Sequence, residues 1–274
     1  MLLKRLPTPK QRFMKNVIIP VDFSETSLNA ARYAAQMLSG KSDASIILYH
    51  MYSHDDEFEM AGTYLDSLKN ELLAKGDKTI ECIREKGDDL IDCLERLSYQ
   101  KIATLIVMGI KGKSSLKQAL IGSNTLKIAT RDVCPVLIVP SEASFNGIKN
   151  VALASDFKDV ENVTPVTYIN AVLDFFKPRL HIVNVNSEIH VALNEELKNE
   201  REWLRTQFSN YNPEFYFITT FDFHDTIEQF VQDRNIDILI NVPRNHGFYH
   251  SVFKANTTKK LAFHSSIPVL AAHE

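Results

Sequence analysis

A glycine-containing stretch in the first half of the chain has the residue types and spacing of a phosphate-binding loop. Gly109 and Gly112 are separated by two residues, and nine further residues lead to Gly122, Ser123 and Asn124. Glycine has no Cβ, so it can adopt a positive φ and lets backbone N–H groups approach a phosphate closely. Ser123 offers a hydroxyl, and a helix that starts there offers free N–H groups and the positive end of its dipole. The stretch therefore predicts a site for a phosphate-bearing ligand.

The residues before this stretch predict where the loop lies in the fold. Residues 105–108 form a short apolar run, typical of a parallel strand that is buried on both faces. Gly109 follows at the carboxyl end of that strand, where open α/β sheets bind ligands. Gly112-Lys113-Ser114 is not a P-loop, because Val107 stands where that motif needs another glycine. Paired glycines are also common in ordinary strand-to-helix loops, which is the alternative interpretation of the segment.

The full pattern resembles the nucleotide-binding signature of the universal stress protein family, Gly-x2-Gly-x9-Gly-(Ser/Thr)-Asn, and matches it at every defined position. Residues 17–24, 48–50 and 134–140 resemble that family's first, second and last strands in the same order. The resemblance covers nearly the whole chain and is stronger in the first half. It implies an adenine nucleotide alpha hydrolase-like fold that binds ATP, with or without Mg²⁺.

Length favours two domains, and the other bulk properties favour a cytoplasmic protein. A chain of 274 residues accommodates two domains of about 130 to 140 residues, each able to bury a core. The net charge of −3 gives no general attraction to nucleic acid or to an anionic membrane. Cys82, Cys93 and Cys134 lack metal-binding spacing and are interpreted as buried thiols of a reducing compartment. We expect a cytoplasmic location, since no apolar run reaches the roughly 18 residues of a membrane span and no secretory signal is recognisable.

Strands and helices are expected to alternate along the first half. Ser24 is placed to cap the first helix, and Asp88 or Asp89 to cap the third. Such alternation predicts a parallel sheet with helices on both faces. The strand order 3-2-1-4-5, implied by the family resemblance, places Asp22 and the loop at Gly109 across one crevice. The expected strands are residues 17–21, 46–49, 79–83, 105–108 and 136–139.

The second half repeats the first, which indicates a tandem duplication. Residues 149–157 align with residues 15–23 at a shift of 134, and residues 267–270 align with residues 134–137 at a shift of 133. We therefore expect two tandem open parallel five-stranded sheets. The expected boundaries are a flexible N-terminal extension at 1–14, a domain with the intact motif at 15–140, a linker at 141–149 and a degenerate domain at 150–274.

The repeat fails at the glycine motif. A shift of 133 aligns Gly109, Gly112, Gly122 and Ser123 with Val242, Asn245, Ala255 and Asn256, respectively. Every glycine is thus replaced by a residue with a Cβ, so we expect nucleotide binding in the first half only.

Several single residues carry two interpretations. Asp22 could accept hydrogen bonds from adenine or ribose hydroxyls, or could cap the following helix. Met51 could line an adenine pocket, although filling the core is the stronger interpretation. His246 and His250 could hold a metal only on one helical face, and a surface loop is favoured there, so no metal site is expected. No serine, cysteine or histidine constellation predicts catalytic residues.

Three functional hypotheses remain open from the sequence. The first is an ATP-binding regulatory protein of the stress response, whose nucleotide state alters an unidentified protein partner. The second is a slow Mg²⁺-dependent ATPase or phosphotransferase, and the third is a scaffold with a structural nucleotide. The apolar final strands, around 134–140 and 267–272, would be bare edges, so we expect them to pair within the chain as a pseudo-dimer. A further homodimer stays open.

Overall fold

The computed structural model describes residues 14–41, 43–74, 79–111, 123–131, 133–186, 195–219, 223–242 and 265–272. The strands of these residues are β1 (Asn16–Pro20), β2 (Ser45–Tyr52), β3 (Thr79–Lys86), β4 (Leu105–Ile110), β5 (Val136–Pro140), β6 (Asn150–Ala154), β7 (Arg179–Asn186), β8 (Glu214–Thr219), β9 (Ile238–Asn241) and β10 (Val269–Ala271). The helices are α1 (Glu25–Met37), α2 (Glu57–Leu73), α3 (Leu90–Lys101), α4 (Ser123–Ile128), α5 (Val160–Val163), α6 (Val166–Phe176), α7 (Glu195–Gln207) and α8 (Phe223–Asp233), with a short 3₁₀ helix at Ser209–Tyr211.

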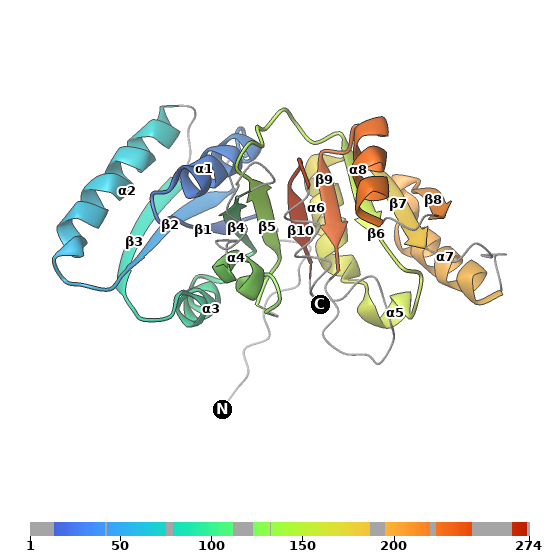
Figure 1. Cartoon of the computed structure of the whole chain (residues 1–274), viewed down its shortest axis with the longest axis horizontal. Helices are drawn as coiled ribbons and strands as arrows, with labels where there is room; N and C mark the ends of the chain where they lie inside the picture. Colours follow the sequence, from blue (N-terminus) through green and yellow to red (C-terminus); the bar gives the residue numbers. More distant parts are fainter. Residues whose placement is uncertain are drawn as a thin grey trace.

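The described strands form one sheet in the order β3-β2-β1-β4-β5-β10-β9-β6-β7-β8 (Figure 1). The first five strands are parallel and follow the expected order 3-2-1-4-5, and the last five follow the same order in their own half. The expected α/β fold class is therefore confirmed.

Helices cover both faces of the sheet, which explains why the central strands are apolar throughout. Ala34 of α1 and Leu65 of α2 belong to the core on one face. Leu94 of α3 and Ile128 of α4 belong to the core on the other face. Ile18 of β1 is completely buried between these layers, as a parallel strand covered on both faces must be.

The two expected sheets are joined edge to edge into one. β5 and β10 pair antiparallel, with Leu137 opposite Leu270, Ile138 opposite Val269, and Val136 opposite Ala271. Leu270 is the repeat equivalent of Leu137, so the pairing is symmetric about these two residues. Each half thus covers the apolar edge of the other, and the structure contains the expected contact between the final strands.

The segment between the halves is packed rather than loose. Ala143 and Ile148 are each only 8% exposed and belong to a core that continues from the first half into the second. Asn29 of α1 donates from its side-chain amide to the carbonyl oxygens of Pro140 and Ala143, at 3.1 and 3.0 Å. The expected linker, residues 141–149, is therefore anchored to α1 at Ala143. Met14, the last residue of the expected extension, is also buried in this core.

The second half departs from the first at its first helix. The counterpart of the continuous α1 is divided into α5, with four residues, and α6. Thr164 ends α5 in an extended conformation, and Pro165 precedes α6, where its missing N–H does not interrupt a helix. The duplication therefore preserves the sheet better than it preserves the helix beside the carboxyl ends of the strands.

Replacing both Val136 and Val269 by lysine is expected to destabilise the protein by several kcal/mol. Both side chains are fully buried next to the β5–β10 junction, and a buried unpaired charge is costly. Tyr99→Lys is the control, since Tyr99 is 57% exposed and its replacement should change the free energy of unfolding by less than about 0.5 kcal/mol. Denaturant unfolding measures the free energy of unfolding of both variants. If the two variants are equally stable, the proposed burial of Val136 and Val269 at the β5–β10 pairing is contradicted.

Candidate functional site

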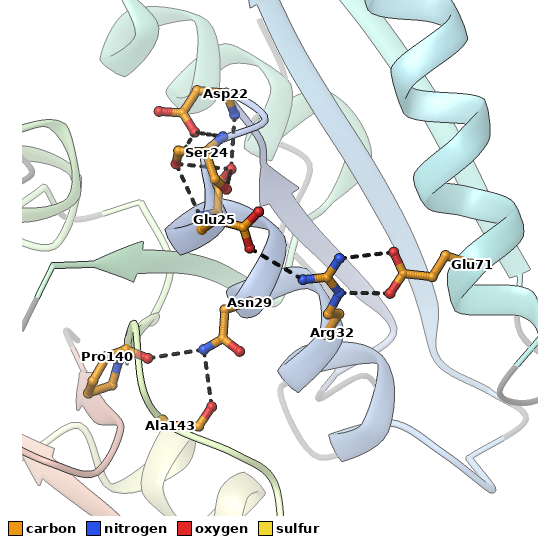
Figure 2. A network of polar contacts seen from close by, with 9 residues as sticks. Asp22, Ser24, Glu25, Asn29, Arg32, Glu71, Pro140 and Ala143 are labelled. Carbon is orange, nitrogen blue, oxygen red and sulfur yellow. Dashed lines mark hydrogen bonds and ion pairs between the residues drawn. The ribbon is translucent and has the colours of Figure 1, made fainter.

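The carboxyl end of β1 turns sharply into α1 around Asp22. The Asp22 carboxylate accepts hydrogen bonds from the backbone N–H of Ser24, at 3.0 Å, and from its hydroxyl, at 2.6 Å. Ser24 caps α1, because its Oγ accepts the backbone N–H of Ser27. Figure 2 shows this group at the start of the helix. The cap is thus Ser24, as expected, and Asp22, which is only partly covered, hydrogen-bonds to the capping residue.

The surroundings of Asp22 keep its carboxyl group ionised. Partial burial raises its pKa, but hydrogen bonds from the side chains of Ser24 and Ser27 and from backbone N–H groups outweigh that effect and lower the pKa overall. An ionised carboxylate can only accept hydrogen bonds. Asp22 therefore offers, at the end of β1, an acceptor suited to hydroxyl or amine donors of a ligand.

Gly109 is required by the packing between β4 and α1. A Cβ added to Gly109 would collide with the backbone oxygen of Thr26 and lie 2.7 Å from Thr26 Cγ2. Gly109 does not use the positive φ that glycine permits, since the described glycines with a positive φ are Gly40 and Gly147. The reason for glycine here is the close approach of the first turn of α1.

Thr125 fixes the start of α4 to the same strand end. Its hydroxyl donates to the carbonyl oxygen of Gly109 at 3.0 Å, and its side chain is buried. α4 begins at Ser123, as expected, and Asn124 in its first turn is exposed. Sequence patterns did not point to Thr125 or Thr26, although a hydroxyl residue directly after Ser-Asn was a usable signal for an anchor.

The strand register brings these elements to one edge of the sheet. Ile18 lies opposite Ile106 in the parallel pair of β1 and β4, and continuing that register places Asp22 level with Ile110. Asp22, Gly109 and the start of α4 therefore share the carboxyl end of neighbouring strands, as predicted for a switch point. Gly112, Gly122 and the side chain of Ser123 lie outside the described residues, so their part in the site stays a prediction.

Met51 lies at the end of β2 and packs against the core. It is partly buried against the cluster that contains Cys93. Its sulfur would lie 3.1 Å from a Cβ on Gly87, so this side chain fills the space that the glycine leaves. These contacts agree with the core-filling interpretation, and its lining of an adenine pocket stays a prediction.

Aromatic side chains support the turn at Asp22 from the side of α2. Phe23 has a left-handed backbone with φ 60°, and its ring centroid lies 4.6 Å from that of His50 and 5.2 Å from that of Tyr64. Nδ1 of His50 is 2.7 Å from the carbonyl oxygen of Val21. These contacts hold a strained turn in place, and sequence patterns gave no sign of them.

The equivalent position of the second half keeps the turn but loses its cap. Phe157 repeats the left-handed backbone of Phe23, and Asp156 accepts the backbone N–H of Lys158 at 3.2 Å. Lys158 replaces Ser24 and has no hydroxyl, and α5 has no side-chain cap. A small hollow lies at the carboxyl ends of β6 and β9, lined by Leu153, Ala154, Ser155, Asp156, Val163, Thr164 and Val242.

The described residues contain neither a metal-binding cluster nor a membrane-spanning helix. They contain no group of three or more histidine, cysteine, aspartate or glutamate side chains placed to hold a metal ion. His246 and His250 lie outside the described residues. Within the described part of the chain, no helix combines the length and apolar character needed to cross a membrane.

Comparison with known proteins gives consistent results. The model of the universal stress protein family matches residues 14–140. A universal stress protein of Methanocaldococcus jannaschii is 26% identical over 143 residues, which cover 47% of this chain and 84% of that protein. One of Bacillus subtilis is 31% identical over 90 residues, 28% of this chain and 60% of that protein. The crystal structure of a universal stress protein from Archaeoglobus fulgidus has a TM-score of 0.73 at 20% identity and covers 94% of this chain and 97% of its own, which shows a shared fold.

Ser24→Ala is expected to raise the pKa of Asp22 and to lower the stability by about 1 kcal/mol, because both the cap and a donor to the carboxylate are lost. A lowered pKa contributes stability above the unfolded value of about 3.9, and this contribution is lost as the pH falls through the folded pKa. The difference in stability between the wild type and Ser24→Ala should therefore become smaller at acidic pH. NMR titration of the Asp22 carboxyl carbon checks the pKa, with Ser39→Ala at the other end of α1 as the control. An unchanged Asp22 pKa in Ser24→Ala would contradict this account.

Gly109→Ala is expected to destabilise the protein by about 1 to 3 kcal/mol, because α1 must move away from β4. Adding Thr26→Ala removes Cγ2 but leaves the backbone oxygen, so the double variant should recover little. Thermal or denaturant unfolding measures both variants. A Gly109→Ala protein as stable as the wild type would show that the close approach is unimportant.

Proposed function

Because residues 14–140 match the model of the universal stress protein family, we propose that the chain is a member of that family: a regulatory ATP-binding protein of the stress response, acting in the cytoplasm, with nucleotide bound by its first half only. One observation carries the proposal. Asp22, Gly109 and the start of α4 meet at the carboxyl end of adjacent parallel strands, and the hydrogen bond from Thr125 to Gly109 holds the last two together.

The residues at this strand end fit an adenine nucleotide. In the proposed complex, the Asp22 carboxylate accepts hydrogen bonds from ribose hydroxyls or the adenine amine. The backbone of the loop from Gly109 to Gly122 provides N–H groups for the phosphates, and Ser123 and Asn124 add side-chain donors. ATP would supply the negatively charged phosphates that these donors bind, with or without Mg²⁺.

The contacts of α1 and the loop favour a regulatory nucleotide over a purely structural one. α1 begins at the Asp22 turn, and Asn29, one turn further on, holds Pro140 and Ala143 of the segment that leads into the second half (Figure 2). The carbonyl oxygen of Ile110, next to Gly109, accepts the backbone N–H of Ser141 at 3.0 Å. In the proposed function, these three hydrogen bonds would carry a change at the nucleotide site to the connection between the halves.

Asp22→Asn is expected to weaken ATP binding by roughly ten- to a hundredfold, the cost of losing a hydrogen bond to a charged acceptor. Asp156→Asn is the matched control, because Asp156 occupies the equivalent turn beside Val242 rather than a glycine, and it should leave the affinity unchanged. Isothermal titration calorimetry with ATP measures both.

Equal losses in the two variants, or no binding by the wild type, would contradict the proposal. A turnover assay on the same samples tests the alternative of slow Mg²⁺-dependent hydrolysis or phosphoryl transfer. ATP that binds without being consumed supports the regulatory function, whereas turnover that disappears in Asp22→Asn supports the enzyme.

A further inference from the structure

The outer edge of β8 ends the sheet with an apolar strand. β8 is the last strand in the sheet order and pairs with β7, and no described strand lies on its other side. Its sequence, Glu-Phe-Tyr-Phe-Ile-Thr, carries charge only at Glu214, and Phe217 is 39% exposed. An exposed edge of this kind presents backbone N–H and C=O groups to any further strand.

The opposite edge of the same sheet is protected by charge. β3 carries Glu81, Arg84, Glu85 and Lys86, and these charges are engaged from neighbouring elements. Glu81 pairs with Lys101 at 2.6 Å, and Lys86 pairs with Asp55 at 2.9 Å. Arg84 donates to a backbone carbonyl of α2, and Glu85 pairs with Arg96. Charged residues on an edge strand are a common means of preventing further pairing, and β8 carries only one, Glu214.

β8 is also held firmly by the aromatic core behind it. Phe217 packs on Phe157 with ring centroids 5.1 Å apart, and Tyr216 packs on Phe230 at 5.0 Å. On one face of the strand, Arg205 lies 4.9 Å from the ring centroid of Phe215. The edge is therefore preorganised, and pairing it requires little ordering of the strand.

From these observations we propose that β8 is an interface at which a second copy of this chain pairs antiparallel across a two-fold axis. The β5–β10 junction shows that the edges of this duplicated fold can pair in this way, symmetrically. Antiparallel pairing also places Glu214 of one copy at the far end of the strand from Glu214 of the other, so like charges do not meet. The inference is independent of nucleotide binding.

The difference between the two edges selects a closed dimer. Pairing of β8 with β3 of another copy would be heterologous and would generate an open filament, and the charged edge of β3 opposes it. Pairing of β8 with β8 uses the apolar edge of both copies and leaves only charged edges outside. Because β8 has only six residues, the interface is shorter than a standard one, and we expect a weak dimer that dissociates on dilution.

Sedimentation velocity of the full chain from about 1 to about 100 μM tests this interface. The wild type should pass from monomer to dimer across this range, and Phe217→Lys should raise the dissociation constant at least about tenfold by placing two lysines at the pairing strands. Tyr99→Lys is the matched control, an exposed aromatic residue of α3 outside β8, and it should dimerise like the wild type. A wild type that stays monomeric, or equal dimerisation by Phe217→Lys, would overturn the proposal.

Hydrogen exchange of the wild type at the two ends of this range provides a test that needs no variant. Amides of residues 214–219 should exchange more slowly at the high concentration, and those of β3 should not change. A dimer in which the β8 amides exchange equally at both concentrations would place the interface elsewhere and overturn the proposal, even if Phe217→Lys fails to fold.

Discussion

The close approach of α1 to β4 at Gly109 is the constraint on which the rest of the first half depends. Only a residue without a Cβ lets the backbone of Thr26 lie against the strand, and this contact sets how closely the first turn of α1 approaches β4. The position of α1 in turn fixes the Asp22 turn, the Ser24 cap and the contacts of Asn29 with the segment between the halves. One missing methyl group thus joins the site to the connection with the second half.

The second half shows the effect of lifting this constraint. Val242 stands at the position of Gly109, Lys158 stands at that of Ser24, and the helix that corresponds to α1 is divided at Thr164 and Pro165. The sheet order nevertheless survives, because it depends on apolar strands buried between helices rather than on the turn. The final strand of the second half still covers the edge of β5.

The sequence predicts the fold well because its signals are local. Apolar runs at regular intervals define the strands. Ser24 caps α1 as expected, and Asp89, one of two expected candidates, caps α3. The family resemblance adds the strand order. The contacts that shape the site are not local, because Thr26 meets Gly109 and Phe23 meets His50 across long stretches of chain, and no periodic pattern marks them. For the same reason the sequence marked Gly109 as a position for glycine but did not identify Thr26 as the neighbour that requires it.

The central claim is that an adenine nucleotide binds where Asp22, Gly109 and α4 meet, and not at the equivalent place in the second half. Native mass spectrometry of the intact protein with added ATP tests it most directly. We predict one nucleotide per chain, lost when Gly122 is replaced by valine and retained when Ala255, its equivalent in the second half, is replaced by valine. Two nucleotides per chain, or one that persists in Gly122→Val and is lost in Ala255→Val, would contradict the account.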